Sequence, residues 1–156
     1  MADGTGNNAY GQRYTIASGP FAGWLSWGQG QDPFETLVGP FCYRVHEDGA
    51  IQIAFQPEAR HLNGAQSIHG GCLMSFADFA LFAIAHHNLQ GGVMAVTLTC
   101  NTEFLGAGNL DGWVEARGEV LKETRSLIFV RGTLHQRGEP ILAFSGTLKK
   151  IKPSPR

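Results

Sequence analysis

Asp78 is the residue of this 156-residue sequence whose type and setting most strongly suggest chemistry. It is the one acidic residue in the apolar segment from Phe76 to Ala85. An ionised carboxylate in such surroundings is costly unless it is paired or hydrogen-bonded. Burial alone leaves two interpretations open: a carboxylate that performs acid–base chemistry, or a polar side chain that bonds to a loop or a partner subunit.

A second feature is the segment Ser67–Gly71 (SIHGG), which stands where a helix should begin. The first backbone N–H groups of a helix have no partner inside the helix, and they carry partial positive charge. Glycine lets a ligand approach that backbone closely. The segment therefore suits an anion or a polarised carbonyl oxygen, and a plain glycine turn into a helix explains it as well.

Both features depend on one predicted helix, at about residues 70–89. Leu, Met and Ala dominate its sequence, and Gly91 and Gly92 supply a stop signal at its end. The segment is apolar on nearly every face up to Ala85, which is typical of a buried helix. His86 and His87 fall in its last turn, where positive charge suits the helix dipole.

Alternating apolar and polar residues predict strands on both sides of this helix. The Asp48-Gly49 turn signal joins the first two of them. The predicted strands are Thr36–His46, Ile51–Phe55, Val93–Phe104, Gly112–Lys122, Ser126–Gln136 and Pro140–Ile151. Two strands, a helix and four strands favour an α+β domain in which a curved antiparallel sheet wraps around the central helix.

The N-terminal residues 1–34 are predicted to form an arm with an aromatic segment, ahead of a single domain at residues 35–156. Phe21, Trp24 and Trp27 are spaced by three, which predicts one or two helical turns packed against the domain. This segment either covers an edge of the core or forms one wall of a ligand pocket.

Composition narrows the possible functions. The net charge of -1 lacks the basic balance of a nucleic-acid module, and a modest excess of Lys and Arg lies near the C-terminus. The longest apolar run is about ten residues, too short to span a bilayer. Cys42, Cys72 and Cys100 form no CxxC pair, and no secretory signal begins the chain. We therefore expect a soluble, cytoplasmic protein without nucleic-acid or membrane partners.

The spacing of the polar residues resembles that of a known family. Asn63 precedes His69-Gly70-Gly71 by six residues, and Asp78 follows the histidine by nine. This pattern, with the apolar helix HGGCLMSFADFALFAIA and the strand VTLTCNTEFL, resembles the hotdog-fold acyl-CoA thioesterases of the PaaI type. The resemblance covers about residues 35–151 and implies the hotdog fold and the hydrolysis of an acyl-CoA thioester.

The resemblance also implies a role for each matching residue. Asp78 is the catalytic carboxylate, which activates water as a general base or attacks the thioester carbon itself. The Gly70 N–H polarises the thioester carbonyl and stabilises the oxyanion. Asn63 orients the carbonyl or the water, His69 holds the loop and contacts the substrate, and Thr97 assists the carboxylate.

Other positions are expected to bind the substrate. Gly71 lies beside the reacting carbonyl, and Arg125 and Lys122 are candidates to contact the phosphates of CoA. Gln66 departs from a common form of the family, which has glycine three residues before the histidine, so the loop after Asn63 is expected to differ in shape. No cofactor is expected, and the histidines lack the spacing of a metal site.

The geometry of a helix adds an argument about assembly. At about 1.5 Å per residue, Asp78 lies roughly 12 Å from Gly70 along the helix, so one thioester cannot contact both in one chain. A two-fold dimer with antiparallel central helices brings each Asp78 near the partner's helix start. The resemblance implies such a homodimer, further paired into a homotetramer.

Two other functions stay open. Hydratases and dehydratases share the hotdog fold, although their usual motifs, such as HFPG, do not occur here. A non-catalytic acyl-CoA-binding protein is the other alternative, and such a protein has no need of Asp78. The sequence does not specify the acyl group.

Overall fold

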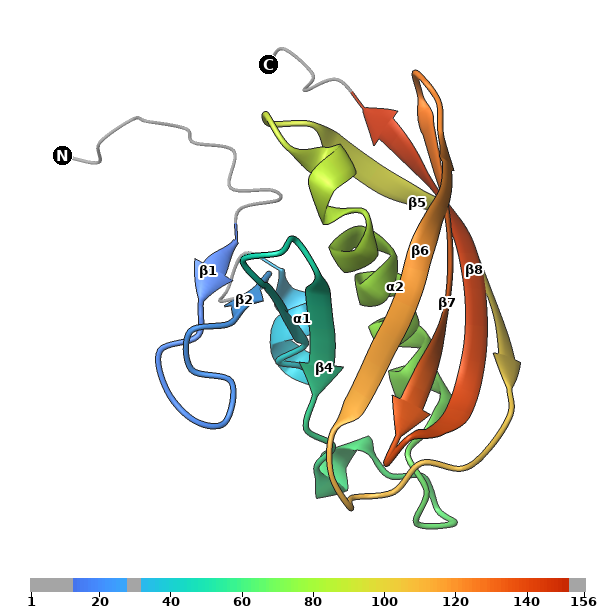
Figure 1. Ribbon diagram of the computed structural model, residues 1–156. Coiled ribbons are helices and arrows are strands. Elements are labelled where there is room, and N and C mark those ends of the chain that lie inside the picture. Colours follow the sequence, from blue (N-terminus) through green and yellow to red (C-terminus); the bar gives the residue numbers. More distant parts are fainter. Residues whose placement is uncertain (1–12, 28–31, 152–156) are drawn as a thin grey trace, which may run out of the picture.

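The computed structural model describes residues 13–27 and 32–151, and its centre is one long helix held in a curved antiparallel sheet (Figure 1). Helix α2 spans Gly70–Ile84, and the sheet has the order β1-β2-β3-β4-β6-β7-β8-β5. The strands are β1 (Tyr14–Thr15), β2 (Leu25–Ser26), β3 (Cys42–Val45), β4 (Ile51–Phe55), β5 (Met94–Phe104), β6 (Val114–Glu123), β7 (Leu127–Gln136) and β8 (Glu139–Ile151). The predicted α+β architecture is confirmed.

Helix α2 is buried on most of its surface, as its composition predicts. Eight of its 15 residues are buried, and glycines in the sheet let it pack closely. A Cβ on Gly146 of β8 would collide with Leu81, and one on Gly118 of β6 would collide with Ile84. The predicted helix at residues 70–89 is interrupted at Ala85, after which a 3₁₀ turn, η2, spans His86–Leu89.

The core between α2 and the sheet is aromatic on the side of β3 and β4. Phe41, Phe55, Phe76 and Phe79 are almost fully buried, and Phe55 meets Phe76 edge-on with ring centroids 4.7 Å apart. Full burial of one such side chain contributes about 1.5–3 kcal/mol, and edge-to-face aromatic contacts add to this. This packing fixes the orientation of α2, and with it the direction in which Asp78 points.

The strand predicted at residues 36–46 is wrong in its first half, where helix α1 spans Pro33–Val38 and β3 begins only at Cys42. Asp32 caps α1, since its Oδ1 accepts a 3.0 Å hydrogen bond from the Glu35 N–H. Proline at the first helical position suits a helix start. The capping residues therefore override the β-rich composition of the segment.

The prediction of helical turns around Phe21, Trp24 and Trp27 is also wrong in the described residues 19–27, which form a turn followed by β2. Phe21 and Trp24 are buried against Trp113, in a cluster separate from the main core. Trp27 stacks instead on Tyr43, with ring centroids 5.2 Å apart. Phe21 and Trp24 thus cover the sheet, whereas Trp27 joins the packing around α2; residues 28–30 lie outside the described part.

Strand β5 is the last strand of the sheet, and its outer edge pairs with no other strand of the described chain. Leu98 and Phe104 on β5 are more than half exposed, and Met74 on α2 is also exposed. An edge strand of this length with exposed apolar side chains is suited to pairing with another strand.

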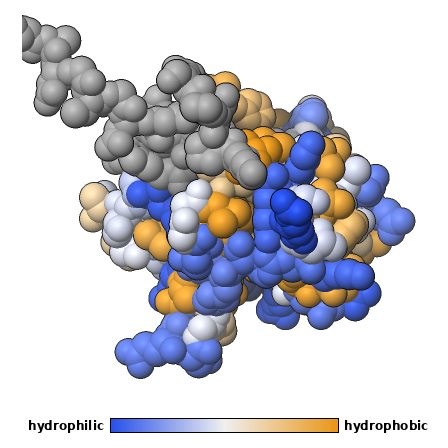
Figure 2. All heavy atoms as spheres, turned by 90° about the horizontal axis from the view of Figure 1, so that it is seen from above, coloured by the Kyte–Doolittle hydropathy of each residue, from blue (hydrophilic) through white to orange (hydrophobic). Residues whose placement is uncertain are grey.

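The view from above shows apolar side chains in several separate areas among hydrophilic ones (Figure 2). No helix in residues 13–27 and 32–151 has the length and apolar character to cross a membrane. The three cysteines are free thiols; Cys42 and Cys72 are buried and Cys100 is half-buried.

Candidate active site

Asp78 is paired with Thr97 across the space between α2 and β5. The Thr97 hydroxyl donates a 2.6 Å hydrogen bond to Asp78 Oδ1, and both residues are half-buried in the single chain. The pairing of β5 with β8 shifts register between Thr97 and Thr99, so Leu98 is an extra residue in the strand. Bulges of this kind re-aim side chains near active sites.

The environment of Asp78 favours the protonated form of its carboxyl group. Burial raises the pKa of Asp78 above its ordinary value of 3.8, the Thr97 hydrogen bond opposes that shift, and the charge of Asp32 adds to it. A carboxylate with a raised pKa and one bound oxygen is a suitable base or nucleophile. Oδ2 of Asp78 has no hydrogen-bond partner among residues 13–27 and 32–151, so it is available to a water or a substrate.

The start of α2 presents one free N–H group. His69 is the N-cap, and its Nδ1 accepts a 2.9 Å hydrogen bond from the Gly71 N–H. No group in the described part of the chain accepts a hydrogen bond from the Gly70 N–H. Of the two glycines, Gly70 therefore keeps the donor that an oxyanion needs, whereas the N–H of Gly71 is engaged in the cap.

Gly70 and His69 both face accessible space. A Cβ on Gly70 would lie 3.0 Å from the Phe104 ring, so glycine leaves room beside that ring. The His69 side chain is exposed, and because its Nδ1 accepts from Gly71, the neutral ring carries its proton on Nε2. That N–H can reach a ligand at the helix start.

Asn63 organises the loop before the helix. Its Oδ1 accepts hydrogen bonds from the N–H groups of Ala65 (2.9 Å) and Ser67 (3.1 Å). Gln66 adopts a left-handed backbone with φ of 60°, a conformation that glycine favours. The amide oxygen of Asn63 is thus committed to the loop, and only its amide N–H groups remain for a substrate.

Asp78 and Gly70 lie on one uninterrupted helix. The separation of roughly 12 Å expected from the helix rise therefore holds in the folded chain. A single thioester carbonyl does not bridge the two residues of one subunit.

Glu35 on α1 is a second acidic residue of this region, and sequence analysis did not identify it. Its Oε2 is buried and has no hydrogen-bond partner in the described part of the chain. Burial, together with the charges of Asp32 and Asp78, raises the pKa of Glu35 from 4.5 to about 8. The Asp32-Pro33 pair is a helix-start signal that predicts α1, and with it the placement of Glu35 on a helix.

Lys122 and Arg125 lie at the other end of α2. Both are exposed, Lys122 on β6 and Arg125 in the turn between β6 and β7 rather than at the start of a strand. The neighbouring Glu123 accepts a 2.6 Å hydrogen bond from Asn88 of η2. In one chain, the two basic residues are therefore distant from the start of the helix at Gly70.

The described residues contain no group of three or more His, Cys, Asp or Glu side chains that could hold a metal ion. His86 accepts or donates a 3.2 Å bond with the Tyr43 hydroxyl, and His87 bonds to the Gly49 carbonyl. His86 and His87 therefore bond to different groups.

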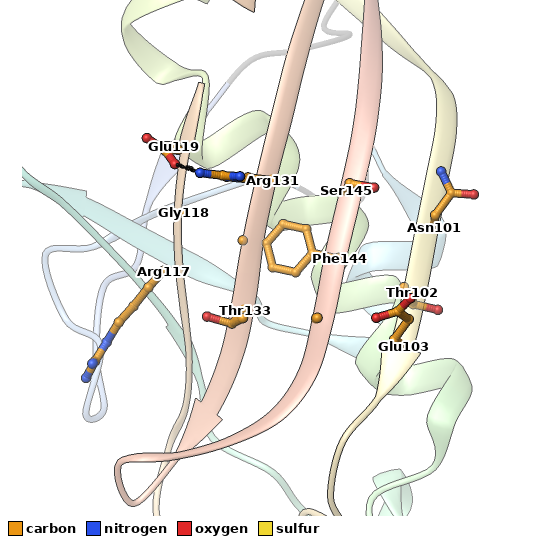
Figure 3. Close-up of a pocket in the computed structure, with 12 residues that line it drawn as sticks. Asn101, Thr102, Glu103, Arg117, Gly118, Glu119, Arg131, Thr133, Phe144 and Ser145 are labelled. Atoms are coloured by element: carbon orange, nitrogen blue, oxygen red, sulfur yellow. Dashed lines mark hydrogen bonds and ion pairs between the residues drawn. The ribbon is translucent and has the colours of Figure 1, made fainter. Parts of the chain in front are cut away.

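A hollow of about 810 Å³ lies over β5 to β8, and it contains none of the predicted site residues (Figure 3). Asn101, Ser145 and Arg131 on its floor alternate along their strands with side chains that face α2. Arg131 is bound to Glu119 by hydrogen bonds of 2.7 and 3.0 Å (Figure 3). The hollow lacks a nucleophile with an adjacent base, so we place the candidate active site at Asp78.

Comparisons with known proteins bear on the family and the fold of this chain. The thioesterase superfamily matches residues 65–143, which is just over half of the chain. A protein of Pseudomonas aeruginosa named as a candidate esterase is 27% identical over 111 residues, which cover 71% of this chain and 82% of that protein.

Solved structures show the same fold. A variant of the phenylacetic acid degradation protein PaaI from Thermus thermophilus is 26% identical, with a TM-score of 0.64 over 77% of this chain and 100% of its own. The PaaI protein of E. coli is 25% identical, with a TM-score of 0.65 over 78% of this chain and 86% of its own. A Bacillus halodurans protein solved with CoA, at 18% identity, has a TM-score of 0.70 over 81% and 83% of the two chains.

These matches confirm the hotdog fold that the resemblance implied. The matched residues 65–143 include helix α2 and strands β5, β6 and β7, and they extend into β8. The chain belongs to the thioesterase superfamily.

Proposed function

We propose that this protein hydrolyses an acyl-CoA thioester to a carboxylic acid and CoA, in active sites shared between two subunits. The observation that carries the proposal is the 2.6 Å hydrogen bond between Thr97 and Asp78, which holds a half-buried carboxylate with one free oxygen. Membership of the thioesterase superfamily supports the reaction class.

Asp78 is the group that starts the reaction. As a general base it takes a proton from water while the water oxygen bonds to the acyl carbon; as a nucleophile it bonds to that carbon directly. The Thr97 hydroxyl stabilises the charged form of Asp78 and fixes its Oδ1, which leaves Oδ2 for the reaction. The raised pKa makes Asp78 a stronger base than an exposed aspartate.

The Gly70 N–H is the proposed oxyanion donor. When the carbonyl carbon becomes tetrahedral, negative charge collects on its oxygen, and a fixed N–H at a helix N-terminus stabilises that charge. His69 supports this arrangement because its Nδ1 holds the adjacent Gly71 N–H. Asn63, which shapes the preceding loop, is proposed to use its amide N–H groups to orient the carbonyl or the water.

Because Asp78 and Gly70 are separated along α2, we propose that a second copy of the chain completes the site. The free edge of β5 offers the means, since two copies can pair there and continue the sheet. A two-fold axis beside β5 sets the two α2 helices antiparallel, and each Asp78 then lies near the partner's helix start. The apolar Leu98, Phe104 and Met74 on this side lose their exposure in such a dimer.

The same dimer brings Lys122 and Arg125 toward the shared site. They lie beside the C-terminal end of α2 in their own subunit, and the antiparallel arrangement places that end near the partner's helix start. We propose that they bind the CoA phosphates. Two relatives, from Bacillus halodurans and Streptococcus pneumoniae, have been solved with CoA. Assembly of two dimers into a tetramer remains a prediction.

The reaction is tested with a panel of acyl-CoA thioesters that includes arylacetyl, benzoyl-type and medium-chain acyl groups. The release of free thiol is followed for each substrate. Thiol release with at least one member supports the proposal and identifies the preferred acyl group. Water addition to an enoyl-CoA without thiol release identifies a hydratase, and tight acyl-CoA binding without any turnover identifies a binding protein.

A further inference from the structure

The stretch of α2 between Gly70 and Asp78 carries an apolar residue at its middle. Met74 follows Gly70 by four residues and precedes Asp78 by four, and all three lie on α2. Residues four apart on a helix share a face, so Met74 neighbours both of them. Met74 is 42% exposed in the single chain. An exposed methionine therefore lies between the two groups of the proposed reaction, which gives it no role so far.

Strand β5 runs beside this part of α2, and two contacts fix where it passes. Near Asp78 the strand supplies Thr97, whose hydroxyl donates the 2.6 Å hydrogen bond to Oδ1. Near Gly70 it supplies Phe104, because a Cβ on Gly70 would lie 3.0 Å from the Phe104 ring. Strand β5 therefore follows α2 from the carboxylate to the proposed oxyanion donor.

Two further side chains of β5 face α2 between these contacts. Cys100 pairs with Gly146 of β8, and directly paired residues of neighbouring strands lie on the same face of the sheet. A Cβ on Gly146 would collide with Leu81 of α2, so Cys100 also faces the helix. Thr102 lies two residues further along β5 and faces the same way. Strand β5 thus forms a wall beside Met74, in which Cys100 and Thr102 are half-buried.

In the proposed dimer, Met74 lies near the two-fold axis. That dimer sets each Asp78 near the partner subunit's Gly70. A two-fold rotation that exchanges two positions on antiparallel helices has its axis level with the residue midway between them. Met74 is midway between Gly70 and Asp78 in the sequence. The Met74 side chains of the two subunits therefore approach each other between the two active sites.

The free edge of β5 is compatible with the same axis. The rotation that exchanges Gly70 and Asp78 also exchanges the points at which β5 passes them. It places Thr97 of one strand opposite the partner's Phe104, and two antiparallel β5 strands can pair in this register through their free edges. One axis therefore satisfies the helix and the strand together.

The direction of the acyl group follows from the proposed position of CoA. Lys122 and Arg125, the proposed phosphate ligands, lie beside the C-terminal end of α2. The CoA moiety then extends from the reacting carbon at Asp78 toward that end of the helix. The acyl group is bonded to the other side of the reacting carbon, so it extends the opposite way, toward Met74 and the two-fold axis.

We propose that Met74 closes the inner end of the acyl pocket and limits the length of the acyl group that the site accepts. This inference rests on the proposed function, because it concerns the substrate of the same site. The pocket extends one turn of α2, roughly 6 Å, from Asp78 before it reaches Met74. A methionine side chain is apolar and fills irregular gaps. A short acyl group fits within this depth, whereas a longer chain collides with Met74.

The experiment measures kcat/KM for butanoyl-CoA and octanoyl-CoA with the wild type, Met74→Ala and Met74→Phe. The readout is the ratio of octanoyl to butanoyl kcat/KM within one preparation, so it does not depend on the fraction of chains that fold or dimerise. Each methylene group in an apolar pocket changes discrimination by about tenfold or more. The ratio should therefore rise by at least about tenfold in Met74→Ala and fall several-fold in Met74→Phe.

Leu121→Ala is the matched control, since Leu121 is another exposed apolar residue, on β6, and this variant should keep the wild-type ratio. An unchanged ratio in both Met74 variants, or a shift in the same direction in both, overturns the role of Met74. The proposed function fails separately, if the wild type releases no thiol from any acyl-CoA thioester, and the inference about Met74 then fails with it.

Discussion

The Thr97 hydroxyl donates a 2.6 Å hydrogen bond to Asp78 Oδ1 and so ties the middle of the central helix to the edge strand β5. This bond stabilises the charged carboxylate and lowers its pKa, against the burial that raises it. It also determines which carboxylate oxygen stays free. The same hydrogen bond therefore fixes the position of the Asp78 carboxylate and stabilises its charged form.

Replacing Thr97 with valine removes this bond and keeps the shape of the side chain. Because the charged form loses a donor, the pKa of Asp78 should rise, and the acidic limb of the profile of kcat/KM against pH should move to higher pH. A hydrogen bond to a charged group contributes about 1.5–3 kcal/mol, so activity at neutral pH should fall by about ten- to a hundredfold. Thr97→Ser keeps the hydroxyl and should stay near the wild type; an unmoved acidic limb in Thr97→Val contradicts this role.

Asp32 raises the pKa of Asp78 by charge repulsion. Asp32→Asn removes this charge and keeps an oxygen that can cap α1. The pKa of Asp78 should fall, so the acidic limb of the profile of kcat/KM against pH should move to lower pH. A full pH profile of kcat/KM checks this. An acidic limb that moves to higher pH, or one that does not move, contradicts this effect of Asp32 on Asp78.

The Gly70 N–H is tested by a pair of variants at one position. Gly70→Pro removes the donor, and proline is tolerated at the first position of a helix; His69 already has the extended backbone, with ψ of 133°, that precedes a proline. The loss of one oxyanion donor typically lowers kcat by about a hundred- to a thousandfold. Gly70→Ala keeps the N–H and adds a Cβ 3.0 Å from the Phe104 ring, so that ring must shift slightly, and this variant should stay clearly more active than Gly70→Pro. Equal activities of the two variants reject the oxyanion role.

Glu35 also predicts how stability changes with pH. Its pKa is about 8 in the folded chain and near 4.5 when the chain is unfolded. Between these values the folded chain holds one proton more than the unfolded chain, so the contribution of Glu35 to stability declines as the pH rises through this range. The Tm of Glu35→Gln should match the wild type at about pH 4 and exceed it at about pH 8.5. Thermal unfolding at a series of pH values checks this; a constant difference contradicts it.

The central helix and the residues at its start could be predicted from the sequence because they depend on local patterns. A long apolar segment that follows two glycines indicates a buried helix, and the isolated Asp78 within it indicates a site. The strands after the helix follow from their alternation. These features need no knowledge of contacts between distant segments.

Helix α1 and the burial of Glu35 could not be predicted in the same way. Six residues are too few to show a helical period, and the β-rich composition of the segment indicated a strand, although Asp32-Pro33 is a helix-start signal. The charge of Asp78, which lies more than 40 residues further along the chain, contributes to the raised pKa of Glu35. The burial of Glu35, which is the largest cause of its raised pKa, and the influence of Asp78 both depend on the fold.

The shared active site is tested most directly by combining two inactive variants. Asp78→Asn should lower kcat/KM for the CoA thioester by at least about a hundredfold, as for the loss of a general base, and Gly70→Pro should be similarly impaired. When the two are co-expressed in equal amounts, about half of the dimers are mixed, and each mixed dimer has one site with both an intact Asp78 and an intact Gly70 from the partner.

Thiol release by this mixture, compared with each variant alone, gives the decisive result. A shared site predicts about a quarter of the wild-type activity, since one site in four is intact. A mixture no more active than the mean of the two separate variants contradicts the shared site, because a site within one chain is never repaired by a partner.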